Sequence, residues 1–152
     1  MIKTLILVRH AHALSRYEAS VSTDSERPLS PQGRQKALQT AQTLCAQKAT
    51  PQIILTSPLL RAVQTAEILS QTLQVPVQTE TLLDGFHTET DVCDFLIKQF
   101  DRYEHILAVS HNPCITYVNA LITKQVIPFA AGAFTQIDMT DLQTPKLTYI
   151  GA

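Results

Sequence analysis

Short apolar runs alternate along this chain with longer stretches in which apolar residues recur at helical spacing. The first run consists of branched aliphatic residues only, which is typical of a strand buried on both faces. This pattern predicts strands over Leu5–Val8, Gln52–Thr56, Val75–Val77 and Ile106–Ser110, and two closing strands, paired antiparallel, over Ala133–Met139 and Leu147–Ile150. Strands that alternate with helices indicate the α/β class, here a three-layer sandwich with a central, mostly parallel sheet flanked by helices.

The helices are predicted from their apolar spacing and from their starts. Three segments open with a residue that often caps a helix, followed by proline, namely Ser30-Pro31, Ser57-Pro58 and Asn112-Pro113. We expect helices from Ser30 to about Gln47, from Ser57 through Leu73, over 92–100, and from Asn112 through Ile122. Residues 14–30 show no clean period and are predicted to form a loop.

Length and composition limit the classes of protein that this chain can belong to. A chain of 152 residues, 45% hydrophobic and 16% charged, suits one globular domain over residues 1–152. The net charge of -1 gives no overall field that would favour nucleic acid or a membrane surface as a partner. No run approaches the ~18 apolar residues of a membrane span, and the first run is too short for a signal peptide. Three scattered cysteines suggest no disulfide framework, so we expect a cytoplasmic protein.

Polar residues follow several of the predicted strands at the point where each strand ends. Arg9 and His10 follow the first strand, Arg61 lies in the first turn of the helix after the second, and His111 directly follows another. The carboxyl ends of parallel strands share one edge of a sheet, so we expect these side chains to converge there. The amino ends of the helices expected at Ser57 and Asn112 would point into the same place. The sequence therefore predicts a site for a dianion such as phosphate.

Four ordered segments resemble those of a known family and together span nearly the whole chain. The tripeptide Arg9-His10-Ala11 resembles the Arg-His-Gly/Ala signature of the histidine phosphatase superfamily, also called phosphoglycerate mutase-like. The other segments that resemble the family are Ser57–Ala62 with Thr65-Ala66, Ser110–Pro113, and Arg27–Ser30 with Gly33. The short length and the Arg-His-Ala-x-Ala form are similar to the SixA-like branch of phosphohistidine phosphatases.

The resemblance implies a phosphoglycerate mutase-like fold and a role for each matching residue. His10 would be the nucleophile that forms a phosphohistidine intermediate. Arg9 and Arg61 would bind the phosphoryl oxygens, and His111 would stabilise the transition state. At the neighbouring motif positions we expect Arg27, Asn112 and Ser57 to bind substrate. An ordinary surface ion pair is the alternative for Arg27.

The general acid is less clearly marked in the sequence. Larger relatives use a glutamate, and Asp84 is the nearest candidate in this chain. Because Asp84 precedes Gly85, an ordinary turn is the alternative interpretation. An imidazole leaves more readily than an alkoxide, so a phosphohistidine substrate is consistent with a weak or absent acid.

Two rival sites use the same histidines. His10 and His12 could bind a metal ion, but the neighbouring arginines would repel a cation, and such sites usually sit on a larger barrel. We expect His12 at the rim. A nucleophile built from Cys114 and His111 is conceivable at helical spacing, although Cys114 is more typical of a small core residue. No metal and no cofactor are therefore expected.

Together these features predict a metal-independent phosphatase that acts through His10. The expected substrate is a phosphohistidine on a protein, such as a histidine phosphotransfer domain of a phosphorelay. A small-molecule phosphomonoesterase of the same superfamily and a catalytically silent phospho-binding module are the alternatives. The sequence does not identify the partner kinase or the oligomeric state.

Overall fold

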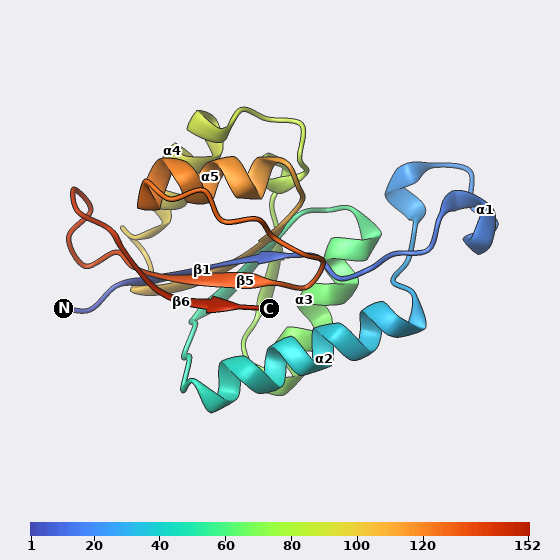
Figure 1. Ribbon diagram of the computed structural model, residues 1–152, viewed down its shortest axis with the longest axis horizontal. Helices are drawn as coiled ribbons and strands as arrows, with labels where there is room; N and C mark the ends of the chain where they lie inside the picture. The colour runs from blue at the N-terminus through green and yellow to red at the C-terminus, as the bar shows by residue number, and fades with distance from the viewer.

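A mixed sheet of six strands forms the middle layer of the protein (Figure 1). The computed structural model describes all residues from 1 to 152. The strands in spatial order are β3 (Val77–Thr79), β2 (Ile53–Thr56), β4 (His105–Ser110), β1 (Thr4–Arg9), β5 (Phe134–Asp138) and β6 (Lys146–Gly151). The first four pair in parallel, and β5 and β6 pair antiparallel at one edge. The predicted α/β class and the antiparallel closing strands are confirmed.

Helices cover both faces of the sheet and make the outer two layers. The helices are α1 (Arg16–Ala19), α2 (Pro31–Ala46), α3 (Leu60–Leu73), α4 (Glu89–Gln99) and α5 (Cys114–Thr123), with short 3-10 turns η1 (Asp24–Glu26) and η2 (Thr81–Leu83). Figure 1 shows α2 and α3 on one face and α4 and α5 on the other. None of these helices is long and apolar enough to cross a membrane.

Two hydrophobic cores, one on each face of the sheet, explain why β1 is apolar without a break from Leu5 to Val8. Leu5 and Leu7 belong to the core under α4 and α5, whereas Ile6 and Val8 belong to the core under α2 and α3. All four side chains are almost completely buried. Because side chains alternate between the faces of a strand, a strand covered on both faces needs an unbroken apolar run.

The helix starts follow the predicted pattern in one case out of three. Ser30 caps α2, because its hydroxyl accepts a 2.9 Å hydrogen bond from the Gly33 N–H and Pro31 is the first helical residue. The predictions for Ser57 and Asn112 are wrong, since α3 begins at Leu60 and α5 at Cys114. Neither side chain caps its helix, and both bond to groups around the site described below.

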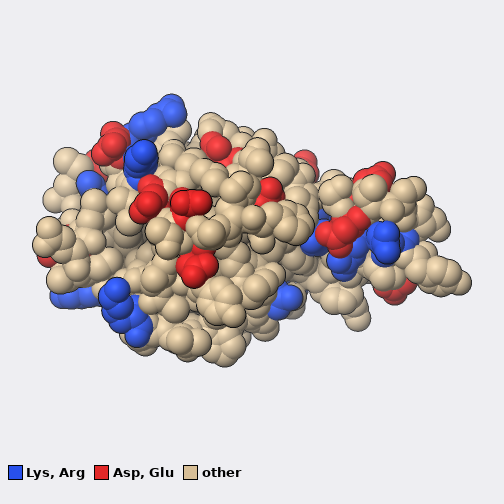
Figure 2. Space-filling model, turned by 90° about the horizontal axis from the view of Figure 1, so that it is seen from above, with Lys and Arg blue, Asp and Glu red and all other residues tan.

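The segment between β1 and α2 projects from the rest of the molecule (Figure 1). Its prediction as an unstructured loop was wrong in part, because it contains α1 and η1. Helix α1 is stabilised by a reciprocal capping box between Ser15 and Glu18. Acidic and basic side chains lie next to one another on this projection (Figure 2). Short helices closed by local polar caps leave no apolar period in the sequence, so the pattern could not reveal them.

A close backbone approach at Gly33 joins α2 to the segment that follows β1. A Cβ atom on Gly33 would lie 2.0 Å from the carbonyl oxygen of His12. We expect Gly33→Ala to lower the free energy of unfolding by about 1–3 kcal/mol, the usual cost of overpacking. The measurement is urea denaturation, with Gln35→Ala at an exposed position of α2 as the control. A Gly33→Ala protein as stable as that control would contradict the packing described here.

Candidate active site

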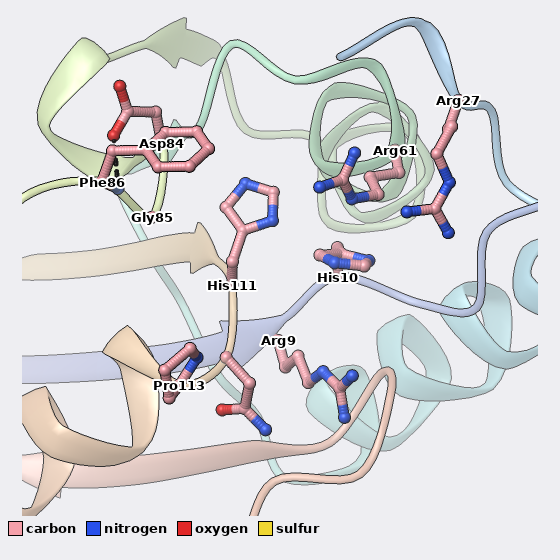
Figure 3. A pocket seen from close by; sticks show the side chains of 10 residues that line it. Arg9, His10, Arg27, Arg61, Asp84, Gly85, Phe86, His111 and Pro113 are labelled. Atoms are coloured by element: carbon pink, nitrogen blue, oxygen red, sulfur yellow. Dashed lines mark hydrogen bonds between the residues drawn. The ribbon is translucent and has the colours of Figure 1, made fainter. Parts of the chain in front are cut away.

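One pocket of about 350 Å³ opens where β1 and β4 end (Figure 3). It is lined by Arg9, His10, Arg27, Arg61, Asp84, Gly85, Phe86, His111, Asn112 and Pro113. The structure thus brings together all four residues that were expected to form the catalytic core. Of the other residues expected at the site, it places Arg27, Asp84 and Asn112 in the lining and leaves Ser57 outside it.

His10 lies just beyond β1 and is held in one tautomer. Its backbone N–H donates to the carbonyl of Ser110, 3.1 Å away on β4. Its ring Nδ1 lies 2.7 Å from the carbonyl oxygen of Ala11. A carbonyl oxygen only accepts hydrogen bonds, so Nδ1 carries the proton and Nε2 keeps its lone pair. Nε2 is therefore the nitrogen that can act as a nucleophile.

The surroundings of His10 also keep its ring neutral. Burial is the main cause that lowers the pKa of His10 to about 4, and the charges of Arg61, Arg9 and Arg27 lower it further. The hydrogen bond to Ala11 acts in the opposite direction. A neutral imidazole beside several guanidinium groups combines a nucleophile with an anion site.

Arg9 is the last residue of β1, and it is fixed by a loop from the other end of the chain. Its Nη1 donates to the carbonyl of Phe129 at 2.9 Å, while its buried Nε has no partner. Asn112 donates to the same carbonyl at 3.0 Å and accepts from the Thr116 hydroxyl at 2.8 Å. Both the nitrogen and the oxygen of the Asn112 amide are therefore hydrogen-bonded to other protein groups. This explains why the side chain does not cap the backbone N–H groups at the start of α5.

Asp24 on η1 joins the other two arginines of the pocket. One carboxylate oxygen lies 2.9 Å from Arg27 Nη1 and the other lies 2.9 Å from Arg61 Nη2. Arg61 also donates to the Asp24 carbonyl at 2.9 Å. The hydrogen bonds from Arg27 and then from Arg61 lower the pKa of Asp24, while burial opposes them. Arg27 thus both lines the pocket and makes the ion pair that was its alternative interpretation.

Asp24 was missed at the level of the sequence. It lies in a polar segment without a period, and only its spacing of three residues from Arg27 hints at an ion pair. Its contact with Arg61 joins η1 to α3 across 37 positions of the chain, and no local pattern reports such a contact.

His111 follows β4 and faces His10, with 4.9 Å between the ring centroids. Its Nε2 lies 2.7 Å from the hydroxyl oxygen of Ser57, and its buried Nδ1 has no partner. Burial, followed by the influence of His10 and Arg61, lowers the pKa of His111 to about 3. Ser57 is fully buried and lies outside the pocket lining, so these contacts give its predicted binding of substrate no support.

Asp84 is part of a turn at the rim of the pocket. Its Oδ1 accepts from the Phe86 N–H at 2.8 Å and lies 2.9 Å from His87 Nδ1. Gly85 completes the turn with a φ of 91°, which a residue with a side chain adopts only under strain. The turn interpretation of Asp84 is therefore correct, and its role as an acid stays a prediction. The turn exposes 80% of Phe86 at the rim, a feature with no signal in the sequence.

The rival sites find no support in these contacts. His12 is exposed, as expected for a rim residue, and its Nδ1 lies 2.7 Å from the Ser30 hydroxyl. The structure contains no group of three or more His, Cys, Asp or Glu side chains that could hold a metal ion. Cys114 is buried, and this burial raises the pKa of its thiol, which disfavours the reactive thiolate.

Comparison with known families identifies the class to which this fold and site belong. The family model described as the histidine phosphatase superfamily (branch 1) matches residues 5–91. The chain belongs to this superfamily, and it is accordingly a phosphatase of the hydrolase class. Among curated proteins, none matches the sequence.

Solved structures share the fold over the full chain. The protein histidine phosphatase SixA complexed with tungstate has a TM-score of 0.87 and 23% identity, covering 98% of this chain and 96% of that one. A putative phosphohistidine phosphatase SixA from Agrobacterium tumefaciens has a TM-score of 0.87 and 18% identity, covering 100% and 99%. A mycobacterial glucosyl-3-phosphoglycerate phosphatase has a TM-score of 0.75 and 16% identity, covering 100% of both chains. The predicted phosphoglycerate mutase-like architecture is confirmed.

The lowered pKa values of the two pocket histidines can be measured directly. An ordinary histidine, with a pKa of 6.5, is mostly protonated at pH 5, whereas rings with pKa values of about 4 and about 3 are neutral there. We therefore expect the His10 and His111 resonances to stay in their neutral positions down to pH 5 in an NMR titration. The variants His10→Gln and His111→Gln assign the two signals. A midpoint near 6.5 for either ring would contradict the burial described here.

Proposed function

We propose that the protein removes a phosphoryl group from a phosphohistidine on another protein, through a covalent intermediate on His10 and without a metal or cofactor. The whole of residues 1–152 would serve as one catalytic domain. The observation that carries this proposal is the neutral His10, whose free Nε2 shares a pocket with Arg9, Arg27 and Arg61. Such a site attracts a phosphoryl dianion and presents a nucleophile to it.

The first chemical step forms the intermediate. The arginines hold the phosphoryl oxygens while His10 Nε2 attacks phosphorus, and the bond from phosphorus to the substrate imidazole breaks. The carbonyl of Ala11 stabilises the charge on His10, because it accepts a hydrogen bond from Nδ1. The departing imidazole leaves as a neutral ring when its other nitrogen already carries a proton. That proton comes from solvent, so the step needs no acid at the reacting atom.

The second step releases phosphate. A water molecule attacks phosphorus, the bond to His10 Nε2 breaks, and the proton lost by the water passes to phosphate or solvent. His10 returns to the neutral ring with its proton on Nδ1. The arginines lower the barrier in both steps because they stabilise the charge that spreads over the phosphoryl oxygens.

The hydrogen bonds that hold Asp84 in its turn support a phosphohistidine as the substrate. Asp84 is the only carboxylate in the pocket lining, and its Oδ1 holds the turn at Phe86 and His87. The leaving group of a phosphate ester is an alkoxide, which benefits from protonation by a positioned acid. The leaving group of a phosphohistidine is an imidazole, which departs without an acid in the site. The site therefore suits a phosphohistidine better than an ester.

One solved structure with this fold supports a small phosphate ester as the alternative substrate. The glucosyl-3-phosphoglycerate phosphatase shares this architecture, and a substrate of that kind is a small phosphate ester. A small-molecule phosphomonoesterase is therefore the second candidate. In that case Asp84 would have to leave its turn or act through Oδ2, and Asp84→Asn would abolish activity.

The test compares a phosphorylated histidine phosphotransfer domain with a panel of sugar, nucleotide and aryl phosphates, each in the presence of EDTA. We expect the phosphoprotein to give the highest kcat/KM, because its imidazole leaves without an acid. Asp84→Asn should reduce this activity only slightly. A sugar or nucleotide phosphate hydrolysed far faster than the phosphoprotein would contradict the proposal, and so would loss of activity in EDTA.

Two variants control for the assignment of the site in the same assay. His10→Ala should abolish turnover of every substrate. Arg61→Ala should lose about 10²-fold or more, the usual effect of removing one transition-state donor. Arg34→Ala, at an exposed position of α2, is the matched control and should behave as the parent protein. Full activity of His10→Ala would exclude His10 as the nucleophile.

A further inference from the structure

His111 carries one proton on two ring nitrogens, and the position of that proton decides what the pocket offers a ligand. The ring is neutral because it is buried. If the proton lies on Nδ1, a hydrogen-bond donor faces the pocket. If it lies on Nε2, a lone pair faces the pocket and repels the oxygens of a bound anion.

The orientation of the ring is set by its neighbours. Figure 3 shows the Nδ1 side of His111 turned toward His10, and this nitrogen is buried without a partner. Nε2 points the other way and lies 2.7 Å from the hydroxyl oxygen of Ser57. The tautomer therefore depends on the direction of the hydrogen bond between Ser57 and Nε2.

The other contacts of the Ser57 hydroxyl settle that direction. The oxygen already accepts a hydrogen bond from the Leu59 N–H at 3.1 Å. Its own O–H needs an acceptor, and His111 Nε2 is the one acceptor within hydrogen-bond distance. If Nε2 carried the proton, both the Ser57 O–H and the Nδ1 lone pair would be buried without a partner, whereas a proton on Nδ1 leaves only the Nδ1–H unpaired until an anion binds. Each unpaired buried group costs about 1–3 kcal/mol. The hydroxyl therefore donates to Nε2.

From this geometry we propose that Ser57 is a positioning residue that holds His111 in the Nδ1–H tautomer, so that His111 donates a hydrogen bond to the phosphoryl group. The two histidines then play opposite parts although both carry the proton on Nδ1. At His10 the Nδ1–H donates a hydrogen bond to a carbonyl, which leaves the Nε2 lone pair for attack. At His111 a hydroxyl caps Nε2 and leaves Nδ1–H for the anion.

The backbone around Ser57 explains why its hydroxyl is available to bond to His111. Ser57 directly follows β2, and its N–H donates to the Val109 carbonyl of β4 at 3.0 Å. This bond places Ser57 beside the end of β4, directly before His111. Because α3 begins only at Leu60, the hydroxyl is not used to cap a helix. The serine is fully buried, so water cannot replace its hydrogen bond to the ring.

The direct test is the ¹⁵N NMR spectrum of the imidazoles in the unliganded protein at pH 7. We expect His111 to show a protonated Nδ1 and an unprotonated Nε2. Ser57→Ala should lose this pattern in favour of exchange between tautomers, and Ser57→Thr, which keeps the hydroxyl, should retain it. The control is Ser70→Ala, which removes a hydroxyl that donates to the Val75 carbonyl at a position outside the pocket.

The kinetic arm rests on the proposed function, whereas the spectrum does not. Ser57→Ala should lower kcat by about 10-fold or more with a smaller effect on KM, because the lost donor acts mainly on transition-state charge. Ser57→Thr should recover most of it. A protonated Nε2 in the parent protein would overturn the inference even if the enzyme is active. The expected spectrum with no phosphatase activity would support the inference and reject the proposed function. If Ser57→Ala fails to fold, the parent spectrum alone decides.

Discussion

The parallel pairing of β1 with β4 determines where the two histidines meet. Arg9 lies opposite Ser110, so the next residue on each strand, His10 and His111, emerges at the same edge of the sheet. The hydrogen bond from the His10 N–H to the Ser110 carbonyl continues this register beyond the strand. A slip by one residue would send one of the rings to the opposite face, since side chains alternate along a strand. Leu5 and Leu7 fill one core and Ile6 and Val8 fill the other, so a slip would exchange the side chains of two close-packed cores, which opposes it.

Burial at this edge sets the chemistry of the pocket. It lowers the pKa of both histidines, so that they stay neutral among guanidinium groups that remain charged. A charged histidine would add to the repulsion among the cations and could not attack phosphorus. The positive charge of the site is instead carried by arginines that the protein anchors separately. Arg9 is held by the Phe129 carbonyl, and Arg61 is held by Asp24.

The sequence predicts the sheet, the layers and the residues that gather in the pocket, because each depends on a local pattern. Apolar runs mark the buried strands, and polar residues at strand ends mark their common edge. Ser57 shows the limit of this reasoning. A serine before a proline has the pattern of a helix start, yet its hydroxyl is used by His111, which is 54 positions away. Asp24 was missed for the same reason, since its partner Arg61 lies on a distant helix.

If every substrate passes through one phosphohistidine intermediate on His10, that intermediate must partition between water and a second acceptor in the same way whatever group has left. Turnover is measured in the presence of an alcohol that competes with water for the phosphoryl group. The substrates are phosphoramidates and aryl phosphates with different leaving groups. We expect the same ratio of phosphate ester to free phosphate for every substrate, because the leaving group has gone before the acceptor attacks. A ratio that changes with the leaving group would exclude a common intermediate on His10.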